Sequence, residues 1–156
     1  MLKLKGKYEF LIGSMRVLTL LSAFENNRSY QMTFDKLILL DFYMRFPQTM
    51  LNLDVKNFDF EELYSFYHSY PDREYYQKIL RILISKRIIE KEIFSSSFVY
   101  RINPIGLEIV KGIKNEYSTQ MYLNALLIKK TISKLSEAKI REEISNKSLN
   151  NIHLIS

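Results

Sequence analysis

Histidines and carboxylates are the side chains of this chain that could carry acid–base or metal chemistry. The chain has two histidines, His68 and His153, and no cysteine. Neither histidine has further ligands at the spacing that a zinc site requires. We predict a surface or core-edge position for His68, a tail position for His153, and no metal site.

Adjacent acidic pairs are the next candidates, at Glu61-Glu62 and Glu142-Glu143. Neighbouring side chains on a helix point apart, so we expect solvated faces rather than acid–base pairs. The four glycines are scattered and form no phosphate-binding loop. The sequence therefore predicts no catalytic residue and no cofactor, and so a protein that is not an enzyme.

Asp41 stands out because it interrupts an apolar stripe that also contains Leu37, Leu40 and Met44. A buried carboxylate is costly unless it is paired or hydrogen-bonded. We predict that Asp41 lies at the edge of the stripe and binds Arg45, four residues further on, or a nearby backbone N–H. Direct contact with a partner protein is the alternative.

A helix, a hairpin and a second helix follow one another within some thirty residues. The apolar spacing predicts a helix over Tyr75–Lys86, a strand over Ile88–Ile93, a turn at residues 95–97 and a strand over Phe98–Ile102. Asn103-Pro104 then begins another helix. This order is typical of the second half of a winged helix. We predict a mainly α fold, a winged helix-turn-helix with a two-stranded β-hairpin and a C-terminal helical extension.

The elements before this block are less regular. We expect a helix over Tyr8–Phe24 after a frayed start, and a second helix from the cap Thr33 to about Phe46, where Pro47 stops it. Residues 48–62 are predicted to form a loop that carries a short turn. The winged-helix domain is predicted to cover residues 8–114.

One long helix is predicted for residues 118–145, with a flexible tail at 146–156. Its apolar seam repeats at spacings of four and three, through Met121, Ala125, Ile128, Ile132 and Leu135. A helix of this length must pack on something. We expect the seam to pack on the chain's own core, with a partner helix or a second copy as the alternative, so Met121, Ile128 and Ile132 are candidate partner-binding residues.

The charge is basic overall but unevenly spread. The chain carries 23 Lys and Arg against 17 Asp and Glu, a net charge of +6. Residues 1–110 contribute a net +2 and residues 111–156 a net +4. No apolar run approaches the ~20 residues needed to span a bilayer. We expect a cytoplasmic protein, with no membrane partner, whose hairpin region is nearly neutral.

Two surfaces could bind other molecules. On the helix before the hairpin, Arg73, Gln77, Lys78 and Arg81 lie off the apolar stripe, where a DNA-reading helix would place its contacts. The hairpin tip, Phe94 to Phe98, has no Lys or Arg, which argues against DNA because phosphate contacts supply much of the affinity. Further possible DNA-binding residues are Lys129, Lys130 and Lys134.

The second surface is an aromatic cluster between residues 64 and 76. Six aromatics in thirteen residues are more than one short segment can bury. Tyrosine is favoured at protein interfaces because it offers a large contact area and a polar tip. We therefore take Tyr67 and Tyr70 as candidate partner-binding residues.

Three apolar blocks resemble a known family. These are residues 16–21 (RVLTLL), residues 36–42 (KLILLDF) and the run Arg45-Phe46-Pro47. Together with the later hairpin they resemble the middle components of bacterial ABC-three-component systems, and are similar to the small subunits of Lamassu-type anti-phage defence. The resemblance covers residues 10–110.

The resemblance implies an accessory subunit without enzyme activity of its own. Such a subunit sits between an SMC-like or Rad50-like ABC ATPase and an effector, often a nuclease, and meets DNA through the assembled complex. A winged-helix transcriptional regulator, dimeric through the C-terminal helix, is the alternative function.

Overall fold

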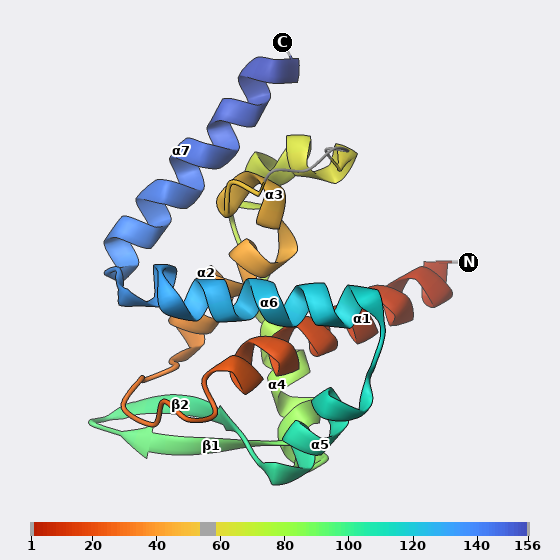
Figure 1. Cartoon of the computed structure of the whole chain (residues 1–156), viewed down its shortest axis with the longest axis vertical. Helices are drawn as coiled ribbons and strands as arrows, with labels where there is room; N and C mark the ends of the chain where they lie inside the picture. Colours follow the sequence, from red (N-terminus) through yellow and green to blue (C-terminus); the bar gives the residue numbers. More distant parts are fainter. Residues whose placement is uncertain (1, 54–58, 156) are drawn as a thin grey trace.

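The computed structural model of the chain describes the backbone of residues 2–53 and 59–155 (Figure 1). Side chains are described from residue 6 to residue 152, apart from residues 54–58. The fold is mainly helical, with one two-stranded antiparallel hairpin among the described residues. Its elements are α1 (Leu2–Ala23), α2 (Phe34–Arg45), α3 (Pro47–Met50), the 3-10 helix η1 (Phe60–His68), α4 (Arg73–Ser85), β1 (Ile89–Phe94), β2 (Ser97–Ile102), α5 (Pro104–Gly112), α6 (Glu116–Lys130), the 3-10 helix η2 (Ile132–Lys134) and α7 (Glu137–Ile155).

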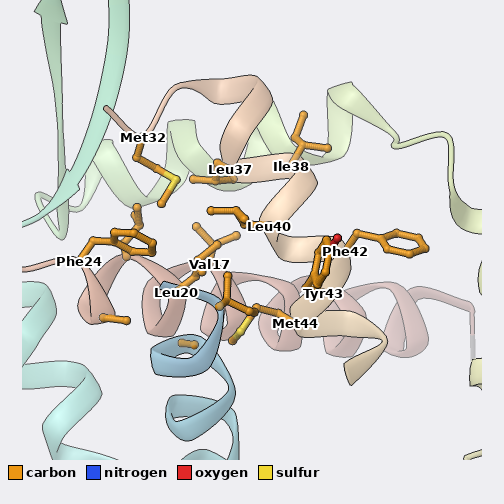
Figure 2. Close-up of a cluster of buried hydrophobic side chains, with 14 of the residues drawn as sticks. Val17, Leu20, Phe24, Met32, Leu37, Ile38, Leu40, Phe42, Tyr43 and Met44 are labelled. Carbon is orange, nitrogen blue, oxygen red and sulfur yellow. The ribbon is translucent and has the colours of Figure 1, made fainter. Parts of the chain in front are cut away.

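Helix α1 forms the centre of the protein. It contacts α2, α4, α5, α6 and β2. Figure 2 shows Val17 and Leu20 of α1 near Leu37 and Leu40 of α2, and all four side chains are fully buried. These four side chains belong to the hydrophobic core. The helix itself begins at Leu2, earlier than the expected Tyr8.

Side-chain caps begin the helices where the sequence predicted them. Thr33 accepts a hydrogen bond from the backbone N of Lys36 at 3.3 Å and so caps α2. Asn103 accepts from the backbone N of Gly106 at 2.9 Å and caps α5. Helix α2 ends at Arg45, two residues before Pro47. These caps are local, and this is why sequence alone locates them.

The hairpin also follows the prediction closely. Strands β1 and β2 pair antiparallel, from Ile89 with Ile102 at the open end to Phe94 with Ser97 at the turn. The two turn residues, Ser95 and Ser96, have φ of 47° and 70°. Two successive positive φ values are the geometry of a type I′ turn, whose twist matches that of the strands. The backbone N of Tyr100 donates to the carbonyl of Met32 at 2.9 Å, which ties β2 to the loop before α2.

The single long C-terminal helix is a wrong prediction, because the chain breaks between Lys130 and Glu137. Hydroxyl side chains compete with the backbone here: Thr131 donates to the carbonyl of Leu127 at 2.7 Å, and Ser136 accepts from the backbone N of Lys139 at 3.2 Å. The predicted seam is nevertheless buried before the break, at Met121, Ala125 and Ile128, and within it at Ile132, whereas Leu135 is half-buried.

The flexible tail is also a wrong prediction, because residues 146–155 continue α7 as helix. Helix α7 packs on η1 and α3. Asn151 is buried, and its amide donates to the Oγ1 of Thr49 at 2.8 Å and to the carbonyl of Glu62 at 2.7 Å. These contacts order a segment whose composition is polar. Residue 156 and the side chain of His153 lie outside the described residues.

The loop expected over residues 48–62 contains two helical elements. Helix α3 covers Pro47–Met50 and η1 begins at Phe60, while residues 54–58 lie outside the described residues. Glu62 is buried rather than solvated, since its carboxylate accepts from the backbone N of Gln48 and of Thr49, each at 3.0 Å. Burial raises the pKa of Glu62, and the two hydrogen bonds oppose this rise.

The seam of α6 supplies a direct test of the fold. Replacing the fully buried Ile128 by Asp is expected to cost about 4 kcal/mol or more, because it places an unpaired charge in the core. Leu123 lies exposed on the same helix, so Leu123→Asp serves as the control and should change stability by about 0.5 kcal/mol or less. Urea unfolding measures both. Equal midpoints for the two variants would show that α6 does not pack as described.

Candidate functional site

A buried ionic network joins α1, α2 and α4. The side chain of Asp41, on α2, is fully buried. Arg16 of α1 donates to it through Nη2 at 3.0 Å and through Nε at 3.2 Å. Tyr76 of α4 donates its hydroxyl to Oδ2 of the same carboxylate at 2.5 Å. Three helices that are distant in sequence therefore meet at one carboxylate.

The pKa values of Arg16 and Tyr76 are both raised in this network. Burial lowers the pKa of Arg16, but the charge and hydrogen bonds of Asp41 outweigh it, and the net pKa lies above its ordinary value. Burial and the charge of Asp41 raise the pKa of Tyr76, so its hydroxyl stays protonated and donates. The network is an arginine–carboxylate pair with a neutral phenol, an arrangement that positions helices.

The partner predicted for Asp41 was wrong. Arg45 is exposed, and its guanidinium lies 5.1 Å from the ring centroid of Phe46. Asp41 faces α1 and α4, where Arg16 reaches it across the helix interface. Because the carboxylate is fully enclosed by this fold, it offers no surface to a partner protein.

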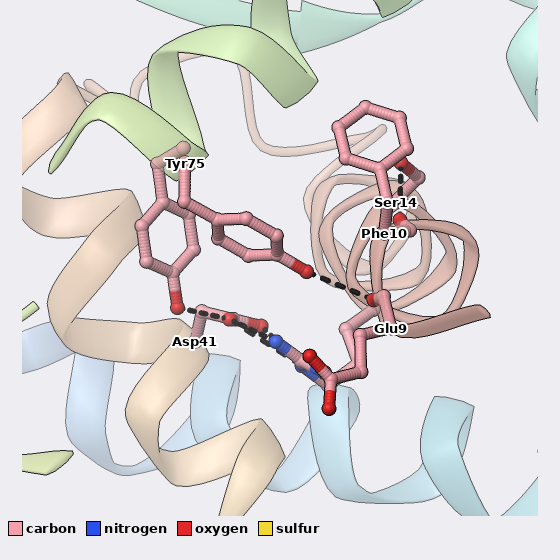
Figure 3. Close-up of polar contacts among 7 residues, drawn as sticks. Glu9, Phe10, Ser14, Asp41 and Tyr75 are labelled. Carbon is pink, nitrogen blue, oxygen red and sulfur yellow. Dashed lines mark hydrogen bonds and ion pairs between the residues drawn. The ribbon is translucent and has the colours of Figure 1, made fainter. Parts of the chain in front are cut away.

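A second contact between α4 and α1 lies beside the network. Figure 3 shows the hydroxyl of Tyr75 donating to the backbone carbonyl of Glu9, at 2.9 Å. The tyrosine crosses α1 at Gly13, where a Cβ would collide with its hydroxyl. Glycine therefore allows the close approach that sets α4 against α1.

The four polar residues predicted on α4 have separate surroundings. Arg73 forms an ion pair with Asp35 at 2.7 Å, and Lys78 lies 5.5 Å from the ring centroid of Phe10. Gln77 and Arg81 instead line a cleft between α4 and the hairpin. The four side chains thus do not form one continuous basic face.

The cleft has a volume of about 730 Å³. Its hairpin wall includes Lys91, whose ammonium lies 3.9 Å from the ring centroid of Phe98. Lys91 is not among the binding residues predicted from the sequence, because that prediction considered only cations at the hairpin tip. Lys91 lies before the tip on β1 and approaches Phe98 only when the two strands pair. The strand register, Lys91 with Tyr100 and Ile93 with Phe98, places all four side chains on one face.

The aromatic cluster has exposed members, as the sequence indicated. Tyr67 is 68% exposed and Tyr70 is 92% exposed, and Phe60 lies exposed on the same 3-10 helix as Tyr67. Tyr76, in contrast, belongs to the core. Their exposure is what an interface requires, and an interface role for Tyr67 and Tyr70 stays a prediction.

His68 is exposed and its ring stacks on Phe46 with the centroids 5.8 Å apart, which agrees with the predicted surface or core-edge position. Burial by its neighbours lowers the pKa of His68. Across the described ranges, no group of three His, Cys, Asp or Glu residues is placed to hold a metal ion. The described helices also include none that is both long and apolar enough to cross a bilayer.

The candidate binding residues of the C-terminal helices are partly buried and partly exposed. Met121, Ile128 and Ile132 are buried in the chain's own core, as the first expectation for the seam had it, so a partner cannot reach them in this fold. Lys130 and Lys134 are exposed and Lys129 is half-buried, near the break between α6 and α7. Their predicted contact with DNA stays a prediction.

Fold and surfaces together describe a small, mainly helical protein with exposed apolar side chains on the hairpin and on η1. The chain belongs to the family described as ABC-three component (ABC-3C) system Middle Component 2, which it matches over residues 10–153. This confirms the family resemblance and extends it beyond residue 110, through α6 and most of α7. No curated protein and no solved structure matches the chain.

The network around Asp41 generates a stability prediction. Asp41→Ala should lose roughly 3–5 kcal/mol, because it strands the buried guanidinium of Arg16. Tyr76→Phe should lose roughly 1.5–3 kcal/mol, because it removes one hydrogen bond to a charged group and keeps the ring. The double variant Arg16→Met/Asp41→Leu is the control and should recover most of the loss. A denaturation midpoint of Asp41→Ala equal to that of the wild type would contradict the network.

Proposed function

We propose that this protein is a non-enzymatic adaptor subunit that links an SMC-like or Rad50-like ABC ATPase to an effector, a nuclease, in a bacterial anti-phage defence complex. The observation that carries the proposal is membership of the Middle Component 2 family over residues 10–153. The name of that family describes one part of a system with three components, and an adaptor must contact two other proteins.

Two separate exposed surfaces support this proposal. The hairpin lies at one end of the long axis and η1, with its exposed tyrosines, lies at the other end beside α7 (Figure 1). The core around α1 lies between them. Two partners could therefore bind at the same time without competing for one surface.

We further propose that α1, α2, α4 and the hairpin form a winged helix, with α4 in the position of the recognition helix. The isolated bridge between Thr33 and Val99 supports this assignment, because it adds a short pairing between the segment before α2 and β2. The wing would then be β1 and β2. In an adaptor this unit serves as a protein-docking module.

A DNA-binding regulator is the second candidate function. Gln77 and Arg81 favour it, because both are exposed on the helix that precedes the hairpin. Arg73 is already paired with Asp35, however, and Ile93 and Phe98 expose apolar surface on the wing. These features suit a protein partner better than the phosphates of a duplex.

Co-purification tests the adaptor. The tagged wild-type chain, expressed in its native host, should retain an ABC ATPase and an effector. Tyr67→Ala/Tyr70→Ala should weaken one of these contacts by about 2 kcal/mol, roughly 30-fold, if the two tyrosines anchor an interface. Tyr117→Ala removes a tyrosine of α6 that is 62% exposed, close to the exposure of Tyr67, and should retain both partners. A wild-type chain that retains neither protein would refute the adaptor function.

Duplex DNA separates the two candidate functions. The isolated adaptor should bind duplex DNA no more tightly than the ~micromolar range of non-specific binding at physiological salt. A mobility-shift titration measures this. Nanomolar, sequence-selective binding that Arg81→Ala abolishes would support the regulator instead.

A further inference from the structure

We infer that the cleft between α4 and the hairpin is the docking site for an acidic segment of a partner protein, one that carries a large apolar side chain next to its carboxylates. This inference rests on the proposed adaptor function and names the site and the chemistry of one of its two contacts.

The walls of the cleft are mixed in character. Helix α4 contributes Gln77, Arg81 and Ile84, and the hairpin contributes Lys91 and Phe98. The volume, about 730 Å³, is in the range of cavities that take up several side chains or a small ligand. The cleft is therefore large enough for a short stretch of polypeptide.

Two carboxylates and two cations line the cleft, but only the carboxylates already have partners of opposite charge. Its two carboxylates have partners: Asp35 pairs with Arg73 at 2.7 Å, and Glu137 pairs with Arg141 at 3.7 Å. Arg81 and the ammonium of Lys91 have no carboxylate partner within the part of the chain that the structure describes. The cleft thus presents two uncompensated cations, and acidic side chains of an occupant would complement them.

Apolar surface adjoins these cations. Ile93 is 74% exposed and Phe98 is 51% exposed, and the two are paired across the strands on the face that carries Lys91. Because Ile93 and Phe98 are neighbours across the strands, their exposed apolar surface is contiguous, which is a feature of contact surfaces. The apolar side chain of such an occupant would cover Phe98, and a neighbouring carboxylate would pair with Lys91 at the same time.

Duplex DNA fits this cleft less well. Two cations can neutralise two phosphates, whereas steep salt dependence reflects about six to ten phosphate contacts. The exposed rings and the Ile93 side chain gain nothing from phosphates, and the carboxylates of Asp35 and Glu137 lie in the same cleft. We therefore assign the cleft to an acidic protein segment.

Charge reversal in the full-length chain tests the assignment. Arg81→Glu/Lys91→Glu, expressed in the native host, should reduce the recovery of one partner at least about tenfold while the other is retained. Lys86→Glu/Lys114→Glu makes the same change in net charge at two exposed lysines outside the cleft and should retain both partners. The thermal midpoint of each variant checks that it folds. If the reversed chain does not fold, Arg81→Gln/Lys91→Gln carries the same expectation with a smaller effect.

A photo-crosslinking amino acid at position 98 identifies the occupant. The crosslinked peptide should come from the partner that charge reversal loses, and should be acidic. A crosslink to DNA, or to a basic segment, would overturn the inference. Full recovery of both partners by the charge-reversed chain would overturn it too and leave the adaptor function standing. If the wild-type chain retains no partner at all, the adaptor function itself fails, and this inference with it.

Discussion

The fold depends on neutralising one carboxylate inside the core. An isolated buried charge costs several kcal/mol, so Asp41 can be buried only where a cation and a hydrogen-bond donor meet it. Arg16 and Tyr76 meet it from α1 and α4, and the three helices pack around this point. Because the hairpin follows α4 directly and is tied to Met32 before α2, the same network sets the place of the cleft.

The end of the protein that is formed by α3, η1 and α7, away from the hairpin, is ordered by a different kind of contact. Here the buried amide of Asn151 and the buried carboxylate of Glu62 satisfy backbone and hydroxyl groups of α3 and η1, and Lys147 donates to the carbonyl of Met50 at 2.9 Å. These polar contacts fix η1, and hence Tyr67, relative to α7. The two exposed surfaces are thus held by separate sets of interactions, which fits the adaptor function that we propose.

The sequence predicts the parts of this structure that are local. The caps at Thr33 and Asn103 and the strands on either side of the hairpin turn depend on residues within a few positions, and they are confirmed. The partner of Asp41 lies 25 residues before it and could not be predicted from helical spacing, which pointed to Arg45. The ordered C-terminus escaped prediction because its buried contacts, such as that of Asn151, are polar. The cleft could not be predicted because Arg81 and Lys91 line one cavity only in the folded protein.

Amide hydrogen exchange of the full-length chain, alone and in the assembled complex, tests most directly whether one rigid body presents two docking surfaces. Binding at both ends should slow exchange in residues 59–70 and in residues 91–98, while the amides of α1 and α2 are already protected in the free chain. New protection in only one of these two segments, or in neither, would contradict a two-surface adaptor.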